Sequence, residues 1–348
     1  QIAQIDADDL AAMGTAQLAA LSAAQVAAIT AGQAAALDSA DLAAFGTGTI
    51  ASLNTAAMAA LTTASVVGLS TDQIPLLGTA QIRALEPAVL AALDSAQIGA
   101  LGTAQIARLT EDQVANLETA DVAALSTTQL AAFGTAAIAA LTTAGVAALD
   151  TDQVRSLSTA QIAAIEAGDL AAMSSTQLQA LTTAQLPALT AGQAGALDSS
   201  DIALLSGAQV AAIGTAAFAA FSTSVINALD TAQVAGLGTA QLRALSATQV
   251  AAIGTDDLNV LSSTQVAALG TGQIAALTTT QLAALDNTQL GYLSTAQLRA
   301  IGATELTALS STQFPALSTT QVAGLSATQV AAMETEDLAA LLGPQVTA

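Results

Sequence analysis

A strict eight-residue repeat runs along the whole sequence and limits what the chain can fold into. Starting at Ile2, every eighth residue is apolar, and only Ala34 and Ala194 in this set are smaller than Val. Starting at Ile5, every eighth residue is Leu, Ile, Met or Phe. We call these sets the first and the second anchor column, and each repeat an octad. Because no insertion or deletion interrupts the register, each octad is expected to be one geometric unit of a repeat array.

The spacing of the two anchor columns predicts helices. The anchors of an octad lie three residues apart, and such residues share a face of a helix but point to opposite faces of a strand. Ala, Leu and Gln also favour helix, whereas Ala is depleted in strands. We therefore prefer an α-helical array to a β-solenoid. One continuous helix is excluded because eight residues overshoot two turns by about 80°, which would wind the apolar stripe around the rod.

Helix-start signals recur at the same place in nearly every octad. In the segment from Leu157 to Ile162, Ser158 is the expected N-cap and Gln161 occupies the third helical position, N3, which makes a capping box. Leu157 and Ile162 flank this box as a hydrophobic staple. The N3 column holds 28 Gln and 8 Asp or Glu among 44 positions. The sequence thus predicts an all-α solenoid with one capped helix of about six residues per octad, supported by Gln ladders between stacked octads.

Proline positions agree with short helices. Pro75, Pro187 and Pro315 each follow a first-column anchor, where a longer helix would lose a hydrogen bond. Pro87 falls at the first helical position of its octad, where Pro is favoured.

Composition excludes several classes of function. The chain has 26 acidic residues against five Arg, and it contains no His, Cys, Lys or Trp. A net charge of −21 disfavours nucleic acid and anionic membranes, because phosphate binding requires a clustered basic surface. No apolar stretch reaches the length of a membrane span. Without His, Cys or Lys, the chain lacks the usual nucleophiles, bases and transition-metal ligands, so we expect no enzymatic activity and no required cofactor.

Pairs of acidic residues at helix starts are the only candidate metal ligands. In each pair one carboxyl lies at the N-cap and the other at N3, where both are expected to accept helix N–H groups and to interact favourably with the helix dipole. The alternative is a Ca²⁺ ion between neighbouring repeats, although no Asp-x-Asp-x-Asp-Gly loop is present. The candidates for Ca²⁺ are Asp6 and Asp9, Asp38 and Asp41, Glu166 and Asp169, and Asp198 and Asp201. Two further pairs of this type are Glu118 with Asp121, and Glu334 with Asp337.

A longer period overlies the octads. The segment 5–13 returns at 165–173, and the two exceptional anchors Ala34 and Ala194 are the same position repeated after 160 residues. We interpret residues 1–348 as one solenoid with a duplication, namely 5–164, 165–324 and a partial third copy at 325–348. Neither end carries the polar capping repeat that solenoids normally need. We therefore expect either a piece of a longer array or head-to-tail self-association into a filament.

The consensus Leu-[Ser/Thr]-Thr-x-Gln-[Ile/Val]-x-Ala, seen in the segment from Leu157 to Ala164, resembles octapeptide-repeat regions of large bacterial secreted or surface proteins of the RTX-like or adhesin-like kind. This resemblance implies export to the cell surface or the extracellular space, and a structural or adhesive role. We thus expect a non-catalytic scaffold, stalk or filament subunit, with an unknown surface or matrix partner. The alternative is a solenoid binding module or adhesin that recognises a peptide or a carbohydrate.

Overall fold

The octad chemistry produces one short helix per repeat. A computed structural model describes residues 1–347, and all the regular elements in this range are helical, with no strand. Forty segments are α-helices of four to six residues, and four are three-residue 3₁₀ helices. The prediction of an all-α solenoid with one helix per octad is confirmed, although many of the helices are shorter than the expected six residues.

The contacts divide the chain into two units, Gln1–Ala180 and Leu181–Ala348. The boundary differs from the 164/165 boundary of the sequence duplication, which stays a prediction. The elements of the first unit are η1 (Ile2–Gln4), α1 (Ala7–Ala11), α2 (Thr15–Ala19), α3 (Ala23–Ala27), α4 (Ala31–Ala36), α5 (Ser39–Ala44), α6 (Thr47–Ile50), α7 (Thr55–Ala59), α8 (Thr63–Val66), η2 (Ile74–Leu76), α9 (Thr79–Ala84), α10 (Pro87–Leu90), α11 (Ser95–Gly99), α12 (Thr103–Ile106), α13 (Glu111–Ala115), α14 (Thr119–Ala124), α15 (Thr127–Ala132), α16 (Thr135–Ala139), α17 (Thr143–Ala147), α18 (Thr151–Ser156), α19 (Thr159–Ala164), α20 (Ala167–Ala171) and α21 (Ser175–Ala180).

The second unit repeats the same architecture. Its elements are η3 (Leu186–Ala188), α22 (Ala191–Ala196), α23 (Ser199–Ala203), α24 (Gly207–Ala212), α25 (Thr215–Ala219), α26 (Thr223–Asn227), α27 (Thr231–Gly236), α28 (Thr239–Ala244), α29 (Ala247–Val250), α30 (Thr255–Asn259), α31 (Ser263–Ala268), α32 (Thr271–Ile274), α33 (Thr279–Ala284), α34 (Asn287–Tyr292), α35 (Thr295–Ala300), α36 (Ala303–Leu306), η4 (Phe314–Ala316), α37 (Thr319–Ala323), α38 (Ala327–Ala332), α39 (Thr335–Ala340) and α40 (Gly343–Val346).

The predicted helix starts are present in the structure. At α19 the Gln161 N–H donates to Ser158 Oγ over 3.2 Å, and the Ser158 N–H donates back to Gln161 Oε1 over 2.9 Å. Where Gly replaces the N-cap side chain, only the second of these bonds remains, as from the Gly102 N–H to Gln105 Oε1 over 2.6 Å.

Proline explains why three octads lack an α-helix. Pro75, Pro187 and Pro315 are the central residues of η2, η3 and η4, because proline cannot donate the N–H that would extend the first turn as an α-helix. Pro87, by contrast, begins α10 as predicted, since the N–H at the first helical position has no partner within the helix.

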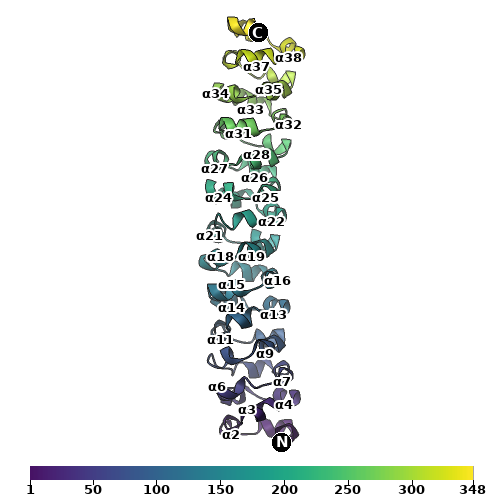
Figure 1. The fold of residues 1–348 in the computed structure, drawn as a ribbon, viewed down its shortest axis with the longest axis vertical. Coiled ribbons are helices and arrows are strands. Elements are labelled where there is room, and N and C mark those ends of the chain that lie inside the picture. The colour runs from purple at the N-terminus through teal and green to yellow at the C-terminus, as the bar shows by residue number, and fades with distance from the viewer. Residues whose placement is uncertain (348) are drawn as a thin grey trace. The chain divides into compact units, whose positions relative to one another are not determined.

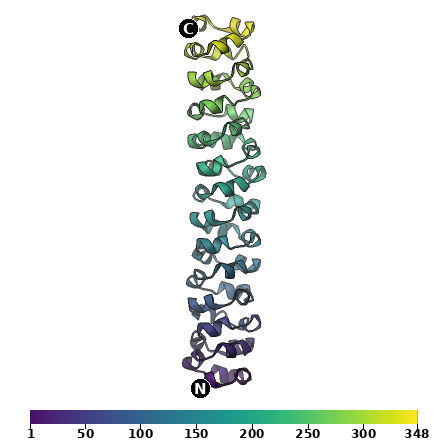
Figure 2. The ribbon, with the colours of Figure 1, turned by 90° about the vertical axis from the view of Figure 1, so that its right-hand side faces the viewer.

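Each coil of the solenoid contains between three and four octads. Helices that pack together most extensively are separated by three octads, as α1 with α4 and α24 with α27. Within each unit the short helices therefore lie in successive layers along the chain, as the change of colour from layer to layer shows (Figure 1). Figure 2 shows the same layering from the side. The number of octads per coil could not be predicted from the octad spacing alone.

The core consists of the two anchor columns. The first-column residues Leu18, Leu42 and Phe218 are fully buried, and the second-column residues Leu53 and Phe45 are 2% exposed. The Ala anchors Ala34 and Ala194 are also fully buried, so even the smallest members of the first column face the interior. At about 25 cal/mol for each Å² of apolar surface removed from water, this double column supplies the main favourable contribution to folding.

Candidate functional site

The buried glutamines at N3 join one coil of the solenoid to the coil before it. The Gln233 amide illustrates the arrangement. Its Oε1 accepts the Asp230 N–H over 2.9 Å, while its Nε2 donates to the carbonyls of Ile202, over 2.9 Å, and Leu205, over 2.7 Å. The acceptors lie 31 and 28 residues earlier in the chain. We call this set of bonds the glutamine clamp.

The clamp recurs in both units, with one acceptor 28 residues earlier and the other 31 residues earlier or, as for Gln81 and Gln249, 30 residues earlier. Gln33 bonds the carbonyls of Ile2 and Ile5, and Gln345 bonds those of Phe314 and Leu317. The acceptor 28 residues earlier always belongs to the second anchor column. The glutamines therefore join stacked octads, as the expected ladders would, but they do so by bonding backbone carbonyls. A clamp uses both ends of the amide, which explains why Gln is preferred to Glu at this position.

The clamp satisfies backbone groups that short helices leave open. A six-residue helix has more unpaired N–H and C=O groups than intrahelical bonds. The clamp supplies one acceptor at the start of a helix and two donors at the end of another. Leaving such groups buried and unpaired would cost about 1–3 kcal/mol each. These bonds accordingly compensate for the shortness of the helices.

The acidic pairs behave differently from one another. The Asp38 and Asp41 pair forms a full capping box, in which the Asp41 N–H donates to Asp38 Oδ1 over 3.0 Å and the Asp38 N–H donates to Asp41 Oδ2 over 2.9 Å. Asp198 and Asp201 form the same box. These two pairs thus use their carboxylates as helix caps.

The other pairs lack part or all of this box. The side chains of Asp6 and Glu166 make no cap hydrogen bond, and Asp169 instead accepts the Thr143 hydroxyl over 2.6 Å. Asp9 lies in α1 and is exposed. Within residues 1–347 no three His, Cys, Asp or Glu side chains come together as a metal site. The Ca²⁺ candidates stay a prediction. Each pair supplies only two carboxylates, whereas Ca²⁺ takes six to eight oxygen ligands.

Burial raises the pKa of several N3 aspartates. For Asp41, Asp121, Asp201 and Asp257, desolvation is the largest cause and it disfavours the charged form. Hydrogen bonds oppose the shift of Asp121, where the Ser95 hydroxyl donates to Oδ1 over 3.0 Å. Asp198 has a lowered pKa, chiefly because the Ser200 hydroxyl donates to it.

Three of the eight N3 positions that lack Gln, Asp and Glu hold Ala, and these three recur every 80 residues. Ala57, Ala137 and Ala217 stand where the clamp glutamine is expected, and each is buried. At the first of these positions, Asn54 replaces the clamp, because its Nδ2 donates to the carbonyls of Ala27 and Ile29. At the third, a Cβ on the N-cap Gly214 would lie 3.1 Å from the Pro187 carbonyl oxygen, so this space is closed.

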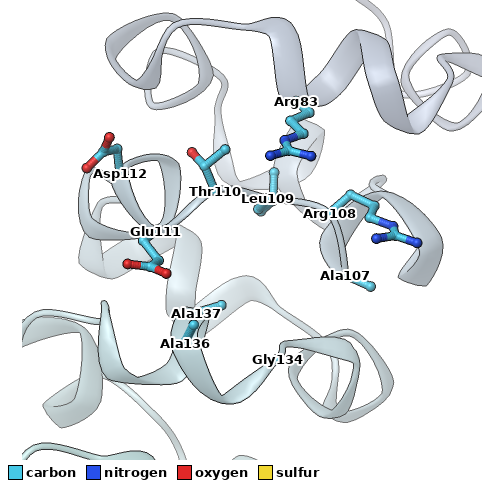
Figure 3. A pocket seen from close by; sticks show the side chains of 10 residues that line it. All are labelled: Arg83, Ala107, Arg108, Leu109, Thr110, Glu111, Asp112, Gly134, Ala136 and Ala137. Carbon is cyan, nitrogen blue, oxygen red and sulfur yellow. The ribbon is translucent and has the colours of Figure 1, made fainter.

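At the second of these positions, Ala137, the space that a clamp glutamine would fill is not closed. A hollow of about 480 Å³ lies beside Ala137, between α9, α13 and α16. Figure 3 shows Arg83 and Arg108 on one side of this hollow, with Glu111 and Asp112 on the other. Sequence reasoning missed this site, because the sequence shows the Ala in the Gln column but not that Arg83 and Arg108 lie close to it in the fold.

The sequence pattern of the ALTTAQ repeat family matches residues 2–39, 34–71, 58–86, 74–111, 114–151, 138–164, 162–199, 226–256, 250–287 and 282–319. The chain belongs to this family. The sequence Ala-Leu-Thr-Thr-Ala-Gln occurs in this chain at Ala180–Gln185. Its Leu is a second-column anchor, and the four residues that follow occupy the N-cap, N1, N2 and N3 positions of the next helix start. The ALTTAQ consensus therefore covers the helix start of the octad and the glutamine that bonds to the preceding coil. No curated protein matches the sequence.

Membrane insertion was not expected, and within residues 1–347 no helix is both long and apolar enough to cross a bilayer.

Proposed function

We propose that this ALTTAQ repeat chain is a non-catalytic structural protein, a scaffold, stalk or filament subunit at the bacterial cell surface or outside the cell. The observation that supports this role is the glutamine clamp, which ties each coil to the preceding one by side chain–backbone bonds such as those of Gln105 and Gln297. In this chain the repeated N3 glutamines join successive coils. A protein built in this way is suited to carrying load or to spacing other components.

Composition supports the non-catalytic part of this proposal. The usual side chains for nucleophilic and general-base chemistry, namely His, Cys and Lys, are all missing from the sequence. The cell-surface location rests on the resemblance to repeat regions of exported bacterial proteins.

Head-to-tail association is part of the proposal, because the octads near each end expose groups whose counterparts elsewhere in the array are buried. Near the N-terminus, Gln17 and Gln25 are exposed; each accepts its own N-cap N–H, and no described carbonyl accepts its Nε2. Near the C-terminus, the first-column anchors Val330, Leu338 and Val346 are 43%, 44% and 67% exposed, whereas interior members of this column are buried. One end thus offers amide donors, and the other offers uncovered anchors.

The C-terminal surface also has the space for another octad. A hollow of about 430 Å³ is lined there by Val330, Met333, Leu338, Leu341 and other residues of the last octads. Octads stacked in register would cover these anchors and would bring glutamine donors to the carbonyls of the last coil. Octads that continue the same chain would do this in the same way as those of a second copy.

The test is the size of the isolated chain across a concentration range, measured by sedimentation velocity and by electron microscopy. We expect concentration-dependent particles of uniform width. Leu338→Glu should abolish them, because it places a charge on the uncovered anchors. Leu76→Glu is the matched control, since Leu76 is 48% exposed but lies far from either terminus in the sequence. A chain that is monomeric at every concentration would refute head-to-tail association.

A second candidate function is a binding module or adhesin for a peptide or carbohydrate. The open hollow beside Ala137 favours it, because it is a recess that carries charged side chains of both signs. Small discrete particles in the microscope, with a ligand held by this hollow, would favour the binding module over the scaffold.

A further inference from the structure

The hollow lies beside an octad that lacks the clamp, because Ala137 stands at its N3 position. In an ordinary octad the amide at N3 lies between the N-cap N–H and a second-column carbonyl 28 residues earlier, as Gln105 lies between the Gly102 N–H and the Leu77 carbonyl. The corresponding groups around Ala137 are the Gly134 N–H and the Leu109 carbonyl. Neither of these groups has a hydrogen-bond partner in the part of the chain that the structure describes.

The space has not closed over these two groups. A Cβ placed on Gly134 would meet no atom within 4 Å, unlike one placed on Gly214 in the octad of Ala217. Ala137, Gly134 and Leu109 all line the hollow. The result is a recess that retains one backbone donor and one backbone acceptor, at the places that an amide group normally fills.

Two arginines line the same recess. Arg83 extends from α9 and Arg108 from the segment between α12 and α13 (Figure 3). Within residues 1–347 neither guanidinium makes a hydrogen bond or an ion pair, whereas Arg155 pairs with Asp152 and Arg243 donates to the Ala268 carbonyl. Two exposed guanidinium groups without a protein partner, both at the rim of one hollow in a chain of net charge −21, form a local site for a carboxylate.

The opposite wall carries the opposite charge. Glu111 and Asp112 begin α13, are exposed, and lie on the opposite side of the hollow from the arginines; the Glu111 carboxylate is directed toward Ala136, and that of Asp112 points outward (Figure 3). A ligand with several carboxylates would be repelled by this wall. A ligand with a carboxylate at one end and an amino or N–H group at the other matches both walls.

We propose that this hollow binds a short peptide segment. Its carboxylate pairs with Arg83 and Arg108, its amino end lies toward Glu111 and Asp112, and an amide between them takes the place of the absent clamp amide. The site is independent of whether the array associates head to tail.

The five Arg residues make the site directly observable. In a chain labelled with ¹⁵N at Arg, each Nε–H gives its own NMR signal, so that a titration reports on five places at once. The probe is the tripeptide Ala-Gln-Ala, which carries one amino group, one side-chain amide and one carboxylate. We expect the signals of Arg83 and Arg108 to shift with a common saturating dependence, and those of Arg155, Arg243 and Arg299 to stay unchanged.

The decisive variant restores the consensus residue. Ala137→Gln should form the missing clamp with the Gly134 N–H and the Leu109 carbonyl, raise the thermal midpoint, and weaken binding of the tripeptide at least about tenfold, which corresponds to 1.4 kcal/mol. Arg83→Gln should weaken binding to a similar degree, and Arg299→Gln, the matched surface control, should leave it unchanged.

Three results would overturn the proposal. One is an equal shift of all five Arg signals, which would indicate general charge attraction. Another is unchanged affinity in Ala137→Gln with a raised thermal midpoint, because the clamp would then have formed without displacing the ligand. The third is the absence of any shift at saturating millimolar tripeptide.

Discussion

The glutamine clamp makes a quantitative prediction that a single residue column can test. Gln233 is 1% exposed, and its side-chain amide makes three hydrogen bonds, one from the Asp230 N–H and two to the carbonyls of Ile202 and Leu205. At a net contribution of about 1 kcal/mol for each bond, Gln233→Ala should lower the free energy of unfolding by about 3 kcal/mol.

The same column provides the control. Gln25 is exposed, and its side chain accepts the Ser22 N–H and the Ser22 hydroxyl but donates to no described carbonyl. Gln25→Ala therefore removes the cap without removing a clamp, and it should cost only about 1 kcal/mol. Urea unfolding followed by far-ultraviolet circular dichroism measures both values. Equal losses for the two variants would show that the bonds between coils add nothing to stability.

A substitution of Gln233 by Glu keeps the size of the side chain but removes its Nε2 donor. Gln233→Glu keeps the acceptor for the Asp230 N–H, but at neutral pH it places a carboxylate against the carbonyl oxygens of Ile202 and Leu205. Burial should raise the pKa of this carboxyl, and once protonated it can again donate one bond. The deficit relative to the parent should thus shrink between about pH 7 and pH 5, above the ordinary Glu pKa of about 4.3. A deficit that is the same at both values would contradict the donor role.

Three further predictions follow from other features. Gly68→Ala should destabilise the first unit by about 1–3 kcal/mol, because the added Cβ would overlap the Ser39 backbone carbonyl, whereas Gly48→Ala has open space in α6 and should be neutral or stabilising in the same thermal-unfolding assay. Lowering the pH from about 6 to about 4, toward the ordinary Asp pKa, should raise the thermal midpoint, since an aspartate with a raised folded-state pKa binds more protons when folded and loses stability as the pH rises through that pKa. The groups concerned are Asp41, Asp121, Asp201 and Asp257, and a thermal midpoint that falls over this range would oppose this reasoning. The lowered pKa of Asp198 acts in the opposite sense but only below its ordinary value of 3.8. Millimolar Ca²⁺ should change the thermal midpoint by no more than about 1 °C relative to chelator, and a sharp rise would instead restore the acidic pairs as a metal site.

The periodic part of the fold could be predicted from the sequence because it depends on local chemistry. The staple and capping box around Ser158 involve residues three to five apart, and the structure contains both bonds of that box. The kind of element in each octad followed from the same signals. The position of Pro75 indicated a break, and the structure has a 3₁₀ helix there.

The way the octads coil could not be read from the sequence. Eight-residue periodicity is compatible with any number of octads per coil, since every octad presents the same anchors. The number is set by how closely the backbones pack and by where the Nε2 of a residue such as Gln105 finds its carbonyls. The site beside Ala137 was missed for a related reason. Ala is common throughout the chain, and its meaning depends on the two arginines that the coil brings near it.

The glutamine clamps have a direction. The clamp Nε2 groups donate to carbonyls that precede them in the chain, as Gln73 does to Leu42 and Phe45, and Gln321 to Leu290 and Leu293. During synthesis, each newly emerged octad therefore finds its acceptors in chain that has already left the ribosome, and it need not wait for anything that follows. Once the first coil has formed, the array can fold one octad at a time from its N-terminal end. Each such step orders one octad, whatever the total number of octads in the chain.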